Sequence, residues 1–218
     1  MRPVWLYLHG FASGPTSFKG REFVGWSRAR GVTMHALDLR VPSMEELRFS
    51  AMKTRVREAI DASGGAHARA VLVGSSLGGL CALRVAEEDP RVCAVFAMAP
   101  AFRLAARWRA RLGEPAFERW KTDGFVEVDD HMTGGRSRVG YSFYDELDRI
   151  DSGFPDVRVP VCIVQGVRDD VVDPENARIF ARGKPHVRLV EVDDGHELVD
   201  SMPEILREAA GFFATFGI

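Results

Sequence analysis

Short, continuously apolar runs alternate along the chain with longer segments whose apolar residues recur at helical spacing. The runs are rich in Val, Leu and Ile and lack the polar alternation of a half-exposed strand. This is typical of parallel strands that are covered on both faces. We therefore expect six strands, at residues 4–8, 33–39, 70–74, 92–98, 161–165 and 187–192.

The segments between these runs predict helices. Ser43 and Glu46 have the spacing of a capping box, and apolar residues then recur at three- and four-residue steps as far as Ile60. Ser13 and Ser17 are candidate caps for a helix that follows them. Further helices are expected at residues 77–88, 174–182 and 203–213. This alternation predicts an α/β fold, with a mainly parallel sheet of about six strands and helices on both faces.

Residues 101–152 interrupt this alternation, because they are too many for an ordinary connection between two strands. We interpret them as a cap inserted over the carboxyl edge of the sheet, within a single domain that spans residues 1–218. The segment predicts helices at 102–112, at 115–121 and from 142, and a strand pair at 125–128 and 138–141 joined by a turn at 133–136.

The side chains of this segment allow two interpretations. Its many aromatic residues are enough to line an apolar pocket. Its first helix also carries Arg103, Arg107, Arg109 and Arg111. We interpret these arginines as the solvated face of an amphipathic helix; the alternative is that one of them binds a carboxylate or phosphate on a substrate.

Charge and cysteine content narrow the class of protein. With 29 Lys and Arg against 31 Asp and Glu, the formal net charge is −2, which gives no basic surface for nucleic acid or an acidic membrane. No apolar run approaches the ~20 residues needed to span a bilayer, and the first residues lack the pattern of a signal peptide. Cys81, Cys93 and Cys162 are odd in number and far apart, so we interpret them as reduced core residues. We expect a cytoplasmic protein with no nucleic-acid or membrane partner.

The sequence Gly74-Ser75-Ser76-Leu77-Gly78 is the candidate for a nucleophile. It follows a predicted buried strand and opens a predicted helix, which is the setting that a G-x-S-x-G nucleophile elbow requires. Small residues two positions before and after the serine relieve clashes at its strained turn. The Ser76 hydroxyl then projects from the sheet edge, and the Leu77 amide points toward a developing oxyanion.

A serine needs a base, and three histidines follow the elbow. His131 falls within the cap, and His186 precedes a strand, at the opposite edge of the sheet from Ser76. His196 lies just beyond the last predicted strand, at the carboxyl edge where α/β sheets bind their ligands. It is therefore the candidate base.

The acid that orients this base is expected beyond the strand at 161–165, where three aspartates follow. Asp173 precedes a proline at a helix start and is more simply an N-cap. Asp169 and Asp170 remain as alternatives, of which Asp169 is favoured. The chain order Ser, Asp, His is the order found in α/β hydrolases.

The loop after the first strand offers a second oxyanion donor, the backbone amide of Phe11. His9, at the end of that strand, is interpreted as a residue that orders the loop rather than as a base. Neither Asp129-Asp130-His131 nor Asp193-Asp194 has the spacing of a defined metal site, so we expect no metal and no cofactor.

At these residues the chain resembles the α/β-hydrolase superfamily, in particular its small bacterial esterase-like members of the YqiA type, which share Leu-Tyr-Leu-His-Gly-Phe at residues 6–11. The resemblance covers nearly the whole chain outside residues 101–152. It implies an α/β-hydrolase fold with Ser76 as nucleophile, Asp169 as acid and His196 as base. It also implies the backbone amides of Phe11 and Leu77 as oxyanion donors.

The chain departs from the family pattern in two places. It has Gln165-Gly166 and Asp173-Pro174 where many members have His-Gly and Val-Pro. It also begins at what the family would call its third strand, without the two antiparallel edge strands of larger members. We therefore expect a six-stranded sheet in which all strands are parallel.

The resemblance implies a serine hydrolase that cleaves a small carboxylic ester with a short-to-medium acyl chain, as a carboxylesterase does. A thioesterase is compatible with the same residues, because the two activities share the triad. A binding protein that keeps a hydrolase-like pocket without turnover is a further alternative, since a fold does not settle a function.

Overall fold

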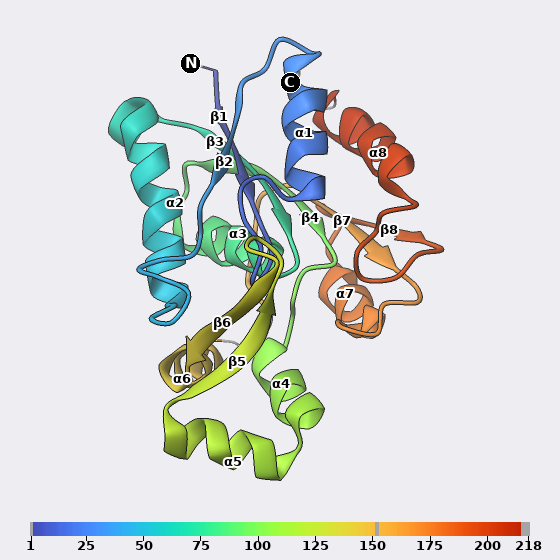
Figure 1. The fold of residues 1–218 in the computed structure, drawn as a ribbon. Helices are drawn as coiled ribbons and strands as arrows, with labels where there is room; N and C mark the ends of the chain where they lie inside the picture. The colour runs from blue at the N-terminus through green and yellow to red at the C-terminus, as the bar shows by residue number, and fades with distance from the viewer. Residues whose placement is uncertain (1, 151–152, 215–218) are drawn as a thin grey trace.

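The computed structural model describes residues 2–150 and 153–214 (Figure 1). Its centre is a six-stranded sheet in the order β2-β1-β3-β4-β7-β8, and every neighbouring pair is parallel, which confirms the expected sheet. The strands are β1 (Val4–Leu8), β2 (Met34–Leu37), β3 (Ala70–Ser75), β4 (Val92–Met98), β7 (Val161–Gly166) and β8 (Val187–Val192).

Helices cover both faces of this sheet. On one face α1 (Phe18–Arg28) and α8 (Met202–Ala214) pack against Trp5 and Tyr7 of β1. On the other face Leu6 and Leu8 of the same strand contribute to a second core. That core also contains residues of α2 (Phe49–Gly64), α3 (Leu77–Glu88) and α7 (Pro174–Ala181). The alternation of side chains along β1 thus divides its apolar residues between two cores, which explains why the strand is apolar throughout.

The start of α2 corrects one prediction. The helix begins at Phe49, not after Ser43. The Ser43 hydroxyl does accept the Glu46 amide at 3.1 Å, but this bond closes an isolated turn, followed by non-helical residues. The helix is capped instead by Glu146, whose carboxylate accepts the amides of Phe49 at 2.6 Å and Ser50 at 3.2 Å. A cap supplied by a residue distant in sequence leaves no local signal.

The segment between β4 and β7 lies beyond the carboxyl ends of the strands (Figure 1). It comprises the helices and hairpin strands α4 (Leu104–Leu112), α5 (Glu114–Asp123), β5 (Phe125–Asp130), β6 (Gly135–Gly140) and α6 (Tyr141–Ile150). β5 and β6 form an antiparallel hairpin. At its tip the His131 amide donates to the Ala12 carbonyl at 2.9 Å, and Arg40 pairs with Asp130 at 2.8 Å. The hairpin is therefore fixed to the loops that follow β1 and β2.

The aromatic residues of this segment pack mainly on one another. The ring centroids of Phe117 and Tyr144 lie 4.7 Å apart, and those of Trp120 and Tyr144 lie 5.6 Å apart. Trp120 is buried, and its ring N–H donates to the Val139 carbonyl at 2.9 Å. These rings thus form a core for the segment. Partly buried Trp108, 4.8 Å from Phe11, lies nearer the loop after β1.

The structure also bears on the expectations of reduced cysteines and of no membrane-spanning segment. Cys81, Cys93 and Cys162 are all free, and burial raises the pKa of Cys81 and of Cys162 to about 12. Within residues 2–150 and 153–214, no helix combines the length and the apolar character that crossing a membrane requires.

Candidate active site

Ser76 lies at the sharp turn between β3 and α3, with φ 53° and ψ −117°. A non-glycine residue in this left-handed region is strained and persists only where the surroundings enforce it. Here two glycines permit the close backbone packing that surrounds this turn. A Cβ atom on Gly74 would lie 2.4 Å from the Gly78 carbonyl oxygen, and a Cβ atom on Gly78 would lie 2.1 Å from the Leu8 carbonyl oxygen. The turn therefore has the geometry of a nucleophile elbow.

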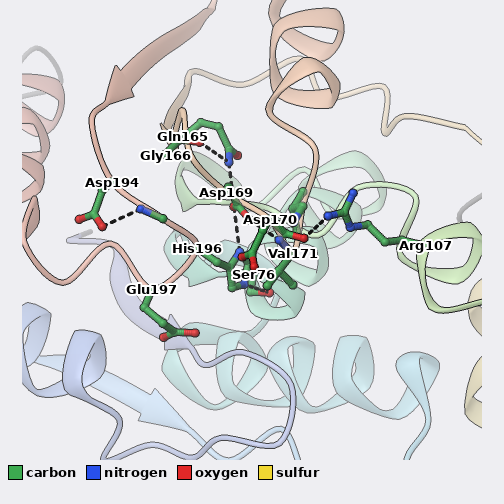
Figure 2. A network of polar contacts seen from close by, with 12 residues as sticks. Ser76, Arg107, Gln165, Gly166, Asp169, Asp170, Val171, Asp194, His196 and Glu197 are labelled. Carbon is green, nitrogen blue, oxygen red and sulfur yellow. Dashed lines mark hydrogen bonds and ion pairs between the residues drawn. The ribbon is translucent and has the colours of Figure 1, made fainter. Parts of the chain in front are cut away.

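His196 follows β8, and its ring joins the serine to an aspartate (Figure 2). Its Nε2 is 3.0 Å from Ser76 Oγ, and its Nδ1 is 2.9 Å from Asp169 Oδ2. An ionised carboxylate only accepts hydrogen bonds, so Nδ1 carries the ring proton. Nε2 is then free to accept the hydrogen bond of the Ser76 hydroxyl.

Asp169 is held by four donors. Its Oδ1 accepts the amides of Val171 at 2.9 Å and Val172 at 2.7 Å. Its Oδ2 accepts His196 and the side-chain amide of Gln165, both at 2.9 Å. Burial by itself raises the pKa of this carboxyl, but His196 and the other donors outweigh burial and hold the pKa below its ordinary value. The group is therefore a carboxylate at neutral pH.

The structure separates the other two aspartates of this loop from the histidine. The Asp170 residue is exposed, and its backbone carbonyl accepts a hydrogen bond from Arg107 (Figure 2). Asp173 caps α7 by accepting the Glu175 amide at 2.9 Å, as expected. Of the three aspartates, the one that the structure brings to His196 is Asp169.

The loop that carries His196 is fixed by residues whose role the sequence did not reveal. Buried Asp194 accepts the amides of Gly195 at 2.7 Å and Ser201 at 2.9 Å. Lys19 of α1 donates to the Glu197 carbonyl at 2.8 Å, and burial lowers the pKa of this amine. Asp194 stands two residues before the histidine and is a local signal, whereas Lys19 is distant in sequence and gives none.

The loop after β1 passes close to the serine. A Cβ atom on Gly10 would lie 3.4 Å from the Ser76 Cβ, so the chain that leads into Phe11 runs beside the elbow. Leu77 is the first residue of α3, and amides of a first helical turn lack an intrahelical acceptor. The two amides expected to bind an oxyanion thus belong to segments that adjoin Ser76.

His9 orders this loop. Its Nε2 accepts the Leu39 amide at 3.0 Å, and its Nδ1 donates to the Gly10 carbonyl at 2.8 Å. Burial is the main reason that its pKa is lowered, which keeps the ring neutral. This arrangement agrees with a structural role for His9.

The remaining histidines after the elbow lie elsewhere. The ring of His186 donates to the Val157 carbonyl at 2.8 Å, before β8. His131 is exposed at the tip of the hairpin. Across the described part of the chain, no group of three His, Cys, Asp or Glu side chains is arranged to hold a metal ion.

Solved structures with this arrangement of strands and helices are numerous. A putative hydrolase from Agrobacterium vitis superposes with a TM-score of 0.82 at 22% identity, covering 97% of this chain and 88% of that one. Alpha/beta hydrolase domain-containing protein 10 from mouse superposes with a TM-score of 0.79 at 20% identity, covering 99% of this chain and 91% of that one. A structure described under LipS and LipT, two metagenome-derived lipolytic enzymes, superposes with a TM-score of 0.76 at 18% identity. It covers 98% of this chain and 94% of that one.

These likenesses show that the chain has the α/β-hydrolase fold. The sequence profile of the uncharacterised protein family UPF0227 matches residues 4–213, so the chain belongs to that family. None of the curated proteins compared with the chain matches it.

Proposed function

We propose that this protein is a serine hydrolase that cleaves small carboxylic esters of short-to-medium acyl chain through an acyl-enzyme on Ser76. The observation that carries the proposal is the continuous hydrogen-bonded chain from Ser76 through His196 to Asp169. The fold neighbours described as hydrolases and as lipolytic enzymes give it further support.

In the first half of the reaction, Ser76 Oγ attacks the ester carbonyl while His196 Nε2 takes the hydroxyl proton. Asp169 keeps the ring in the required tautomer and stabilises the imidazolium that forms. The imidazolium then gives its proton to the leaving alcohol. In the second half, His196 activates a water molecule, which hydrolyses the acyl-enzyme.

The negative oxygen of each tetrahedral intermediate needs donors that are already in place. We assign this role to the backbone amides of Phe11 and Leu77. The proximity of Gly10 to the Ser76 Cβ and the position of Leu77 at the first turn of α3 support the assignment.

We further propose that residues 101–152 act as a cap within a single domain. The hairpin tip is bound to the loops after β1 and β2, and α4 reaches the acid loop through the bond from Arg107 to the Asp170 carbonyl. A substrate would therefore enter between these elements and the elbow.

Steady-state hydrolysis of p-nitrophenyl esters of graded acyl length tests the proposal, with Ser76→Ala and Ser75→Ala compared. Ser75 precedes the nucleophile and is the matched control. We expect Ser76→Ala to lower kcat by a factor on the order of 10⁴ or more, and Ser75→Ala to retain most activity. Wild-type turnover in Ser76→Ala would contradict the proposal. A parallel panel of acyl thioesters decides between an esterase and a thioesterase.

A further inference from the structure

Gln165 is a fully buried polar residue at the end of β7, beside the proposed site (Figure 2). Its Nε2 donates to Asp169 Oδ2 at 2.9 Å and to the Gly166 carbonyl at 3.3 Å. Its Oε1 is buried and has no hydrogen-bond partner among the described residues. One end of this amide is thus bound and the other is not.

The orientation of the amide follows from chemistry. The reverse orientation would place Oε1 against a carboxylate oxygen, and two acceptors cannot form a hydrogen bond with each other. A buried carbonyl without a partner destabilises a fold, and an apolar side chain of similar length would avoid this penalty. Stability therefore does not account for an amide at this position, whereas its contact with Asp169 does.

We propose that Gln165 is a positioning residue, which holds Asp169 Oδ2 in line with the His196 ring through its side-chain N–H. This inference rests on the function proposed above. Oδ2 accepts only two donors among the described residues, Gln165 and His196. The His196 ring changes its protonation state during the proposed reaction, whereas the Gln165 amide does not. Gln165 is therefore the constant restraint on this oxygen.

Several charged groups lie near Gln165 and Asp169. Asp194 and Glu197 lie in the His196 loop, and Lys19 reaches that loop from α1, where it experiences the charges of Asp169 and Asp194. None of these groups is altered by a substitution at Gln165. A change in the pH profile of such a variant can therefore be assigned to the loss of the amide.

The test compares Gln165→Met and Gln165→Leu with Ile163→Val. Met and Leu both remove the donor but differ in shape, so agreement between them separates the lost hydrogen bond from a packing defect. Ile163 is buried on the same strand, two residues earlier, and hence on the same face. Its replacement by Val disturbs the core without touching Asp169.

We expect both Gln165 variants to keep or raise Tm while kcat falls about tenfold and KM stays the same, since the lost bond is to a charged group. The acid limb of kcat/KM should move to higher pH, because Asp169 loses a donor that stabilises its charge. Ile163→Val should lower Tm and leave kcat unchanged. Wild-type kcat and pH profile in the Gln165 variants would overturn the inference, as would a large fall in Tm, which would make the amide a structural group.

A measurement without turnover separates this inference from the proposed function. The His196 Nδ1 proton, assigned by its absence in His196→Ala, is followed by ¹H NMR. Its resonance should shift in Gln165→Met, because Oδ2 then serves a single donor, and stay in place in Ile163→Val. An unchanged resonance in Gln165→Met overturns the inference. Failure of the wild-type protein to hydrolyse any ester would instead count against the proposed function, and this NMR comparison would still test Gln165.

Discussion

The backbone amides that Asp169 and Asp194 accept lie within seven residues of them, whereas the tip of the β5–β6 hairpin also contacts residues from far along the chain. Asp169 accepts amides two and three residues ahead of it, and Asp194 accepts the next amide and that of Ser201. At the hairpin tip, Asp130 pairs with Arg40 and the His131 amide donates to the Ala12 carbonyl. The first arrangement is encoded locally, and the second exists only in the folded molecule.

The two kinds of contact have different effects on the structure. Short-range backbone bonds set the orientation of a side chain within a loop, which the proposed chemistry needs to fractions of an ångström. Long-range pairs decide where a whole element lies. We therefore expect changes in the two loops to reduce activity at nearly constant stability, and changes at the hairpin to reduce stability first.

The largest effect within the loops is expected at Asp169. Asp169→Asn preserves shape but lets the side chain offer an N–H to His196, which favours the wrong tautomer; kcat should fall by about 10³–10⁴. Asp170→Asn is the matched control and should stay within a few-fold of wild type, because the Asp170 contact in the site uses its backbone carbonyl. Ester hydrolysis by the two variants is the measurement. Inactivation by Asp170→Asn alone would contradict the assignment of the acid.

The elbow between β3 and α3 is the next test. In Gly78→Ala the new Cβ meets the Leu8 carbonyl oxygen at 2.1 Å, so the free energy of unfolding should fall by about 3 kcal/mol or more. Gly25 in α1 has nothing within 4 Å of a Cβ atom, and Gly25→Ala should raise stability by about 0.5–1 kcal/mol. Urea denaturation measures both. Equal effects would show that close approach at the elbow is not the constraint.

The hairpin is tested at Asp130, whose side chain is completely buried and accepts Arg40, Ser137 and two backbone amides. Asp130→Asn should lower the free energy of unfolding by about 2–3 kcal/mol. Asp129→Asn, on the same strand but 81% exposed, should change it by less than about 0.5 kcal/mol. Chemical denaturation of the two variants checks this contrast.

The same carboxylate predicts a pH dependence. Burial raises the pKa of Asp130, but its hydrogen bonds and Arg40 outweigh burial, so the pKa lies below the ordinary 3.8. The stabilisation is therefore complete above about pH 4 and is lost as the pH falls toward the folded-state pKa. The stability difference between wild type and Asp130→Asn should be constant near neutrality and shrink in acid. A difference that grows in acid would reverse the assigned sign.

The smallest effect is expected where α6 caps α2. Glu146→Ala removes the acceptor for the amides of Phe49 and Ser50 and should lower stability by about 1 kcal/mol. Asp148→Ala, at an exposed position of the same helix, should have an effect within about 0.5 kcal/mol. Thermal unfolding of the two variants compares them, and a similar Tm for both would remove Glu146 as the cap.

The contrast between local and distant contacts also explains what the sequence could predict. The six strands of the central sheet were predicted to within two residues at each end. The inner strands β1, β3, β4 and β7 are continuous apolar runs buried on both faces, whereas the edge strands β2 and β8 leave some residues exposed. The proximity of Ser76, Asp169 and His196 could be predicted because each follows a strand at the same sheet edge. The contact of Gln165 with Asp169 was missed, although the two residues are four positions apart, because a buried strand residue gives no sign of its side-chain contacts.

Distant partners explain the remaining errors. The helix after Ser43 was placed too early, since buried Met44 and Leu47 continue the apolar pattern of α2 without being helical. The true cap, Glu146, lies 97 residues from Phe49. Lys19 lies 178 residues from Glu197, whose carbonyl it binds. Pairs of this kind have no sequence pattern and emerge only from the fold.

The central claim is that the hydrogen-bonded chain activates the Ser76 hydroxyl. The most direct test is intact mass spectrometry after treatment with a fluorophosphonate probe, for wild type and Ser76→Ala together. The account predicts one adduct on the wild-type protein and none on the variant. A folded wild-type protein that stays unlabelled, or a variant that is labelled equally, would contradict it.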